Sequence, residues 1–259
     1  MKFFEPSGVF FLLKMFGKNR QKVVEWLQSL SKIILFNDHR ANTFVGDELI
    51  TFGKSLDFLR EDKFVDLATK NFVGPGQHEP EHRALIWRRY IQIWAGEHCK
   101  KLNGSFCDFG CYDGAASNFV NDYCDLENRN IKFYLYDLFE TPPNVPKQSK
   151  HDKELYDEVK NRFKNYKNIE IIRGSLPETL EENCPENISF AHIDLNNAET
   201  ELSVLEFIYD RIVKGGIIVF DDYGWSHYKD QQVKEKEFLE KRGQKTLELP
   251  TGQGLLIKW

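Results

Sequence analysis

Acidic residues and glycines end several short apolar runs in the second half of the chain, where they could bind a charged ligand. The first run ends in Asp108-Phe-Gly110-Cys-Tyr112-Asp-Gly114. Its two glycines allow a tight turn and a close approach of the backbone to a ligand, and a helix that follows would point its positive N-terminus at the same place. An acid two residues before Gly110 suits a ligand with a cationic end. The alternative is an ordinary strand-to-helix turn.

Asp137 ends the next run, at a point where a carboxylate commonly accepts hydrogen bonds from both hydroxyls of a ribose. A helix cap or a solvated loop acid is the alternative. The third run ends at Gly174-Ser175, where an adenine could lie against the backbone. The pattern is not the G-x-G-x-x-G fingerprint, because its first glycine is missing, so a nicotinamide dehydrogenase is disfavoured. The glycine loop with these two acids resembles the S-adenosylmethionine site of class I methyltransferases.

These residues need a parallel sheet to bring them to one edge. The β-rich runs are 105–110, 131–137, 169–174, 188–194 and 215–223, and the helical candidates between them are Ala115–Tyr123, Lys153–Tyr166, Glu199–Ile212 and Gln231–Arg242. Strands that alternate with helices imply a parallel sheet with right-handed crossovers. Two closing runs, 244–250 and 254–259, predict an antiparallel hairpin. We therefore expect a doubly wound α/β fold with a mostly parallel, seven-stranded, Rossmann-like sheet.

Residues 1–100 predict a helical N-terminal extension or cap, and residues 101–259 the S-adenosylmethionine-binding domain. Apolar residues recur at helical spacing in 23–36 and again in 83–102, where arginines and lysines lie on the opposite face. These helices could form a subunit interface of a homo-oligomer. The apolar stretch 8–13 is too short to span a membrane, which takes about 20 apolar residues, and it lacks the cleavage site of a signal peptide.

Further motifs narrow the resemblance to one family. The stretch Asp137-Leu-Phe-Glu-Thr-Pro-Pro, the run His192-Ile-Asp194-Leu-Asn196 and the strand 215–224 resemble the macrocin O-methyltransferase family, which methylates sugar hydroxyls of antibiotics. The stretch 249–254 is similar to the turn between the last strands of relatives. The resemblance covers roughly residues 100–259 and implies methyl transfer from S-adenosylmethionine to a hydroxyl of a sugar or glycoside, as a free small molecule or on a glycan. The cofactor-binding residues that it implies are Asp108, Gly110, Gly114 and Asp137, with Tyr112 and Ser175 as further candidates.

Asp194, Asp221 and Asp222 form an acidic trio at the ends of the fourth and fifth strands. These strands are normally neighbours in such a sheet, so the three carboxylates should converge. Clustered anions repel one another unless protons or a cation neutralise them, and oxygen ligands suit a hard ion such as Mg²⁺ or another divalent cation. The resemblance implies the same ion, held by these acids to grip two vicinal hydroxyls. The alternative is that Asp222 caps a helix or binds backbone amides while Asp221 pairs with a lysine.

The sequence departs from the family pattern at the position expected for the base that removes the acceptor's proton. Sugar methyltransferases of the family often carry an aspartate two residues after the first metal-binding acid, where this chain has Asn196. Asparagine cannot accept a proton, so the candidate bases are His227, whose intrinsic pKa suits the task, and Glu199. Two other functions stay open: methylation of a catechol-like small diol, and a catalytically silent binding domain in which Asn196 marks lost activity.

Composition excludes several other classes of protein. The 259 residues are 41% hydrophobic and 29% charged, which fits a folded chain and disfavours a disordered one. The 35 basic and 40 acidic residues give a net charge of −5, which disfavours a general nucleic-acid binder. Five cysteines without a C-x-x-C pair disfavour a zinc site and favour a reduced, cytoplasmic compartment.

Overall fold

The computed structural model describes residues 44–51, 54–72, 85–140 and 153–259. The chain divides into two compact units, of which the second comprises Gly46–Leu49 and Asp57–Trp259 and contains every residue discussed below as part of the site. The predicted helix at 23–36 lies outside the described residues. The predicted boundary at residue 100 stays a prediction, although two helices that precede it belong to the second unit.

A short hairpin interrupts the N-terminal part, which the sequence predicted to be mostly helical. Its strands are β1 (Phe44–Gly46) and β2 (Leu49–Thr51). The two turn residues, Asp47 and Glu48, both have positive φ, at 53° and 56°. A two-residue turn of this kind matches the natural twist of paired strands, and here it places an aspartate at the tip.

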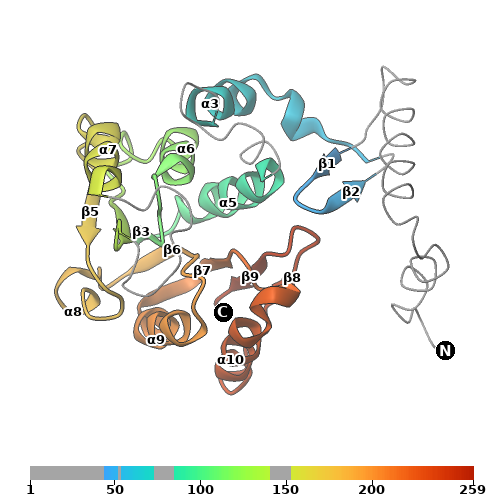
Figure 1. Cartoon of the computed structure of the whole chain (residues 1–259), viewed down its shortest axis with the longest axis vertical. Helices are drawn as coiled ribbons and strands as arrows, with labels where there is room; N and C mark the ends of the chain where they lie inside the picture. The colour runs from blue at the N-terminus through green and yellow to red at the C-terminus, as the bar shows by residue number, and fades with distance from the viewer. Residues whose placement is uncertain (1–43, 52–53, 73–84, 141–152) are drawn as a thin grey trace. The chain divides into compact units, whose positions relative to one another are not determined.

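The second unit is built on the predicted seven-stranded sheet (Figure 1). Its strands are β3 (Ser105–Phe109), β4 (Phe133–Asp137), β5 (Ile169–Arg173), β6 (Ile188–Ile193), β7 (Ile212–Phe220), β8 (Leu247–Glu248) and β9 (Gly254–Ile257). They lie in the order β5-β4-β3-β6-β7-β9-β8. The first five are parallel, and β9 runs antiparallel to both β7 and β8. The predicted fold class, including the C-terminal hairpin, is confirmed.

Helices cover both faces of this sheet, so the fold is doubly wound. The helices are α3 (Asp62–Phe72), α5 (Ile86–Cys99), α6 (Ala115–Cys124), α7 (Lys153–Phe163), α8 (Leu180–Asn183), α9 (Ala198–Ile208) and α10 (Lys229–Glu240). α6 packs against α3 and α5 on one side, and α9 packs against α10 on the other (Figure 1). None of the helices in the described ranges is long and apolar enough to cross a membrane.

The four helices predicted between strands are all present, with ends shifted by a few residues. α9 begins at Ala198 because the side chain of Asn197 accepts hydrogen bonds from the backbone N–H groups of Glu199 and Thr200. Its last predicted turn is a separate 3₁₀ helix, Tyr209–Arg211. These shifts leave the strand ends, and the residues that follow them, where the sequence placed them.

β6 lies in the middle of the sheet and is buried along its whole length. Both of its faces are covered by helices, which explains why the run Ile-Ser-Phe-Ala-His-Ile does not alternate between apolar and exposed polar residues. His192 is the one titratable residue of this strand, and its imidazole is buried. A buried polar group needs partners, and the partners of His192 lead to the candidate site.

Candidate active site

Gly110, at the end of β3, lies against the end of the neighbouring strand β6. Its φ is +93°, and a Cβ added to it would lie 1.9 Å from the carbonyl oxygen of Asp194. The Gly110 N–H donates to the carbonyl of Tyr136 at 2.8 Å, which ties the turn to β4. Glycine is therefore required here because the rim of the sheet is closely packed, in addition to any ligand that approaches the turn.

Asp137, at the end of β4, holds the same turn from the other side. One carboxylate oxygen accepts the backbone N–H of Tyr112 at 2.8 Å and the other accepts that of Phe139 at 2.7 Å. Its carbonyl accepts the N–H of Gly174 at 3.1 Å, which brings the exposed Ser175 beside it. Gly114 follows as the N-terminal cap of α6 with φ +72°. The sheet thus brings these predicted cofactor-binding residues to the ends of adjacent strands.

Asp108, another predicted cofactor-binding residue, is buried inside the rim. Only 3% of it is exposed. One oxygen lies 2.8 Å from Nδ1 of His192, and the other accepts the hydroxyl of Ser117. Any contact of Asp108 with a ligand must share these oxygens, so in the described structure its first role is to anchor His192.

His192 links Asp108 to Asp221 on β7, with Nε2 lying 3.4 Å from a carboxylate oxygen of Asp221. The side-chain amide of Gln92 lies 2.7 Å from the same nitrogen. Burial by itself lowers the pKa of His192, but the charges and hydrogen bonds of Asp108 and Asp221 outweigh it and raise the pKa to about 10. The two acids therefore favour a proton on the buried imidazole. In the sequence this residue stands out only as part of a motif, with no role assigned to it.

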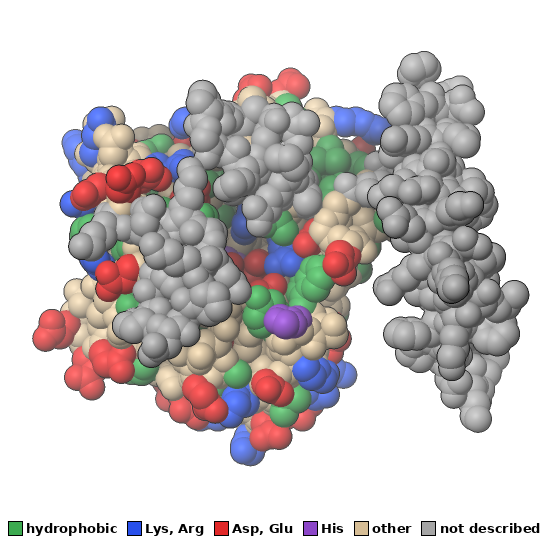
Figure 2. Space-filling model, in the orientation of Figure 1, with side chains coloured by type: hydrophobic (Ala, Val, Ile, Leu, Met, Phe, Trp, Pro, Cys, Tyr) green, Lys and Arg blue, Asp and Glu red, His purple; other side chains and the backbone are tan. Residues whose placement is uncertain are grey.

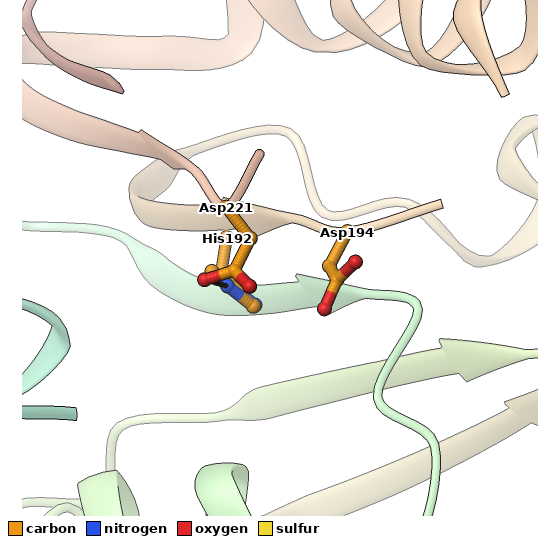
Figure 3. A group of neighbouring side chains, drawn as sticks. All are labelled: His192, Asp194 and Asp221. Carbon is orange, nitrogen blue, oxygen red and sulfur yellow. Dashed lines mark hydrogen bonds and ion pairs between the residues drawn. The ribbon is translucent and has the colours of Figure 1, made fainter. Parts of the chain in front are cut away.

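Asp194 and Asp221 converge at the ends of β6 and β7, as predicted. Figure 3 shows their side chains and that of His192 on the same side of the two strand ends. Potential ligand atoms of these three residues lie within 4.8 Å of one another. Among the described residues, the Asp194 carboxylate accepts a hydrogen bond only from the side chain of Asn196, at 3.1 Å. Burial and the charge of Asp221 raise the pKa of Asp194 well above its usual range.

Asp221 and Asp222 are paired with Arg88 of α5. Nη1 of Arg88 lies 2.7 Å from Asp221 Oδ2 and 3.0 Å from Asp222 Oδ1. The other Asp221 oxygen accepts the side-chain amide of Gln253 at 2.9 Å. Burial alone would raise the pKa of Asp221, but His192 and Arg88 hold it well below its usual range. Burial and Asp221 raise the pKa of Asp222 to about 6, although Arg88 acts in the opposite direction.

Arg88 corrects one expectation from the sequence. Helical spacing put the arginines of 83–102 on a polar outer face, yet Arg88 is only 6% exposed. On its far side, Nε and Nη2 bind the two carboxylate oxygens of Asp47 at 2.6 and 3.1 Å. Its guanidinium also lies 5.2 Å from the ring of Trp225. The alternative expected for Asp221 was a pairing with a lysine, and the structure instead pairs it with an arginine of another element.

The three predicted catalytic residues have different surroundings. Asn196 has a φ of +54° and its amide orients Asp194. Glu199 forms an ion pair with Lys234 at 2.9 Å, and its side chain is 78% exposed. His227 lies exposed in the 3₁₀ helix Ser226–Tyr228, where its ring contacts that of Tyr228. Of the three, only Asn196 directly contacts an acid of the trio in the described structure.

A buried pair of glutamates supports the loop that carries Asp194. Glu201 Oε1 accepts the backbone N–H groups of Leu195 and Asn196 at 2.8 and 3.1 Å. Glu235 of α10 is 1% exposed, and neither of its oxygens meets a donor among the described residues. Burial, together with the charge and hydrogen bond of Glu201, raises the pKa of Glu235 well above its usual range. A proton on Glu235 can therefore bridge the two carboxyls beneath the site.

The donor chemistry of this rim fits a hard divalent cation. Carboxylates outnumber cationic side chains: the acids are Asp47, Asp108, Asp194, Asp221 and Asp222, and the cations are Arg88 and His192. Figure 2 shows acidic and basic side chains together near the middle of one face. Among the described residues, Asp194 and Asp222 each accept one side-chain hydrogen bond, and Asp194 differs in forming no ion pair. The ring nitrogens of His192 already face Asp108, Asp221 and Gln92, so the carboxylates are the better ligands.

The sequence matches a known family, and the fold is similar to those of solved structures. The sequence model of a family described as Macrocin-O-methyltransferase (TylF) matches residues 96–246, more than half of the chain. No curated protein matches the sequence.

Solved structures with a similar fold include the O-methyltransferase NovP, which is 16% identical, with 74% of this chain and 88% of that chain covered and a TM-score of 0.57. CalS11, a calicheamicin methyltransferase, is 15% identical over 79% of this chain and 93% of its own, with a TM-score of 0.54. The Podospora anserina methyltransferase PaMTH1, bound to SAH, is 12% identical over 91% and 95%, also with a TM-score of 0.54. At these identities the likeness shows the fold.

Proposed function

Because this chain belongs to the macrocin O-methyltransferase family, we propose that it transfers the methyl group of S-adenosylmethionine to a hydroxyl of a sugar or glycoside. The observation that carries the proposal is the order of the strand ends. The family match, residues 96–246, includes every strand end from Asp108 to Asp222. The glycine turn and Asp137 lie on β3 and β4, and the acidic trio follows on the adjacent β6 and β7. A nucleoside and an acceptor could thus lie side by side along one edge.

The cofactor would lie over the turn between β3 and α6. Asp137, whose carboxylate holds the turn through the N–H groups of Tyr112 and Phe139, would also accept hydrogen bonds from the ribose hydroxyls. Gly110 and Gly114 both have positive φ, and a Cβ on either would meet neighbouring atoms, so the turn beneath the cofactor requires glycine at both positions. The exposed Ser175 stands next to Asp137 through Gly174 and would lie at the adenine.

Methyl transfer needs the acceptor oxygen, the methyl carbon and the sulfur in line, with the proton leaving the oxygen and the thioether leaving the carbon. The chain would supply mainly alignment. Asn196 would position Asp194 through its 3.1 Å hydrogen bond and would not accept the proton. His227 is the proposed base, because it is exposed and its ring has no hydrogen bond to the described residues. Glu199 is less suited, since Lys234 holds its carboxylate.

A divalent ion such as Mg²⁺ belongs to the same proposal. Asp194, Asp221 and Asp222 would hold it, and Asp194 is the one of the three that has no ionic partner among the described residues. When bound, such an ion lowers the pKa of a hydroxyl that contacts it. The three acids would also orient the acceptor through its neighbouring hydroxyls.

The proposal is tested by calorimetric titration with S-adenosylmethionine and by methyl transfer to a panel of free sugars, nucleotide-linked sugars, glycosides and catechols. We expect cofactor binding and transfer to a sugar. Asp194→Asn should reduce transfer by about 100-fold while leaving cofactor binding within about twofold. Asp157→Asn is the matched control, because Asp157 is a surface acid whose ion pair among the described residues is with Lys160. Absence of cofactor binding would refute the proposal, binding without transfer to any acceptor would favour the silent domain, and transfer to catechols alone would favour the small-diol enzyme.

A further inference from the structure

Arg88 occupies the position between Asp221 and Asp222 that a bridging cation would take. A single nitrogen, Nη1, lies 2.7 Å from one carboxylate and 3.0 Å from the other. The same nitrogen lies 3.2 Å from the carbonyl oxygen of Asp221. Three oxygens of two consecutive residues thus converge on one cationic group.

The guanidinium is held on its opposite side by a separate set of contacts. Nε and Nη2 meet the two oxygens of Asp47 in the fork-to-fork geometry that makes such pairs strong. The two sets use different nitrogens. Arg88 can therefore leave Asp221 and Asp222 while it keeps its pairing with Asp47, the residue at the tip of the β1–β2 turn.

Electrostatics makes the two cations mutually exclusive at this pair of acids. The side chains of Arg88, Asp221 and Asp222 are 7%, 5% and 13% exposed, so water screens their charges weakly. An arginine and a divalent ion that share the same two carboxylates would lie within a few ångströms of each other and repel. Each can neutralise the acids, but both cannot do so from the same side.

We propose that Arg88 competes with the divalent ion for Asp221 and Asp222, so that the chain binds divalent ions weakly until the guanidinium withdraws to Asp47. This inference rests on the metal-assisted part of the proposed function. It makes Arg88 a built-in counter-cation that sets metal affinity. In the state without an ion, Arg88 keeps two adjacent buried carboxylates from repelling each other.

The test measures Mg²⁺ and Mn²⁺ binding to the full chain by calorimetry, without cofactor or acceptor. Arg88→Met removes the competing charge and keeps most of the apolar stem, and we expect it to bind Mg²⁺ at least about tenfold more tightly than the wild type. Arg88→Lys keeps the charge but loses the two-pronged pairing with Asp47, so we expect its Mg²⁺ affinity to lie between those of the wild type and Arg88→Met. Arg242→Met is the control, because Arg242 stacks on the ring of Phe238 away from these acids, and it should bind Mg²⁺ as the wild type does.

A second variant tests whether tighter Mg²⁺ binding comes from the loss of the Arg88 side chain itself or from the change in net charge. It also keeps the inference testable if Arg88→Met misfolds. In Asp47→Asn/Arg88→Met one negative and one positive charge are removed together, so the net charge of the cluster is unchanged. This double variant should also bind Mg²⁺ at least about tenfold more tightly than the wild type, and Mg²⁺ should raise its melting temperature more. Equal or weaker Mg²⁺ affinity in both variants would overturn the inference. Cofactor binding, measured in parallel, reports on the proposed function independently: wild-type cofactor affinity with unchanged metal affinity refutes only the role of Arg88.

Discussion

Replacing Gly110 by alanine should destabilise the protein strongly, because the added methyl group would meet backbone. The Cβ would lie 1.9 Å from the carbonyl oxygen of Asp194, and the φ of +93° disfavours any L side chain. The backbone conformation costs about 1–2 kcal/mol, and relief of the overlap by movement of the strand ends costs about 1–3 kcal/mol more. We therefore expect the free energy of unfolding to fall by about 2–5 kcal/mol, a large part of the roughly 5–15 kcal/mol that holds a typical domain together.

Gly243 provides the matched control for this experiment. It follows α10 with a φ of +69°, and nothing lies within 4 Å of a Cβ added there. Gly243→Ala should therefore lose only the conformational part, about 1 kcal/mol. Urea unfolding followed by circular dichroism measures both variants, and their difference isolates the close approach of β3 to β6. If Gly110→Ala is no less stable than Gly243→Ala, the packing argument for the rim is wrong.

Two further predictions concern the buried carboxyls. The pKa of Glu235 in the folded protein lies above its value in the unfolded chain. The stability that the neutral carboxyl contributes is therefore complete below about pH 4, near the unfolded pKa. It is lost as the pH rises through the folded pKa. Glu235→Gln keeps a donor toward Glu201 without ionising, so its melting temperature should fall less than that of the wild type from pH 5 to pH 9; parallel curves would contradict the buried proton. Asp137→Asn should weaken S-adenosylmethionine binding by about tenfold or more, because a charge-assisted hydrogen bond contributes about 1.5–3 kcal/mol; an unchanged dissociation constant in calorimetry would exclude Asp137 from the ribose site.

Strand ends were the part of the site that could be predicted from sequence. The run before Asp194 is apolar because β6 is covered on both faces, and a polar residue that ends such a run must lie at the edge of the sheet. The same reasoning placed Asp137 and Asp221 at strand ends, and the structure has both there or one residue beyond. Helix ends were less well predicted, since capping side chains such as Asn197 decide them.

The burial of Arg88 could not be predicted from the pattern of apolar and polar residues in its own helix. Periodicity describes one helix at a time, and by that measure an arginine between apolar positions belongs on the solvent side. Its burial depends on acids that lie 41 residues before it, at Asp47, and 133 residues after it, at Asp221. A charge is buried only where partners are present, and those partners come together only when α5 packs on the sheet. The role of His192 was hidden for the same reason, because its two acids lie on the strands to either side.

The sequence by itself determined the class of sheet, the family and the set of acids along its edge, because burial and chain direction are local consequences of hydrophobic pattern. Tertiary structure decided which cation faces which acid. That pairing arises between elements distant in the chain, where charges removed from water take the nearest partner that packing allows. For this protein the partner of Asp221 and Asp222 is an arginine of α5, and among the described residues Asp194 has no ionic partner.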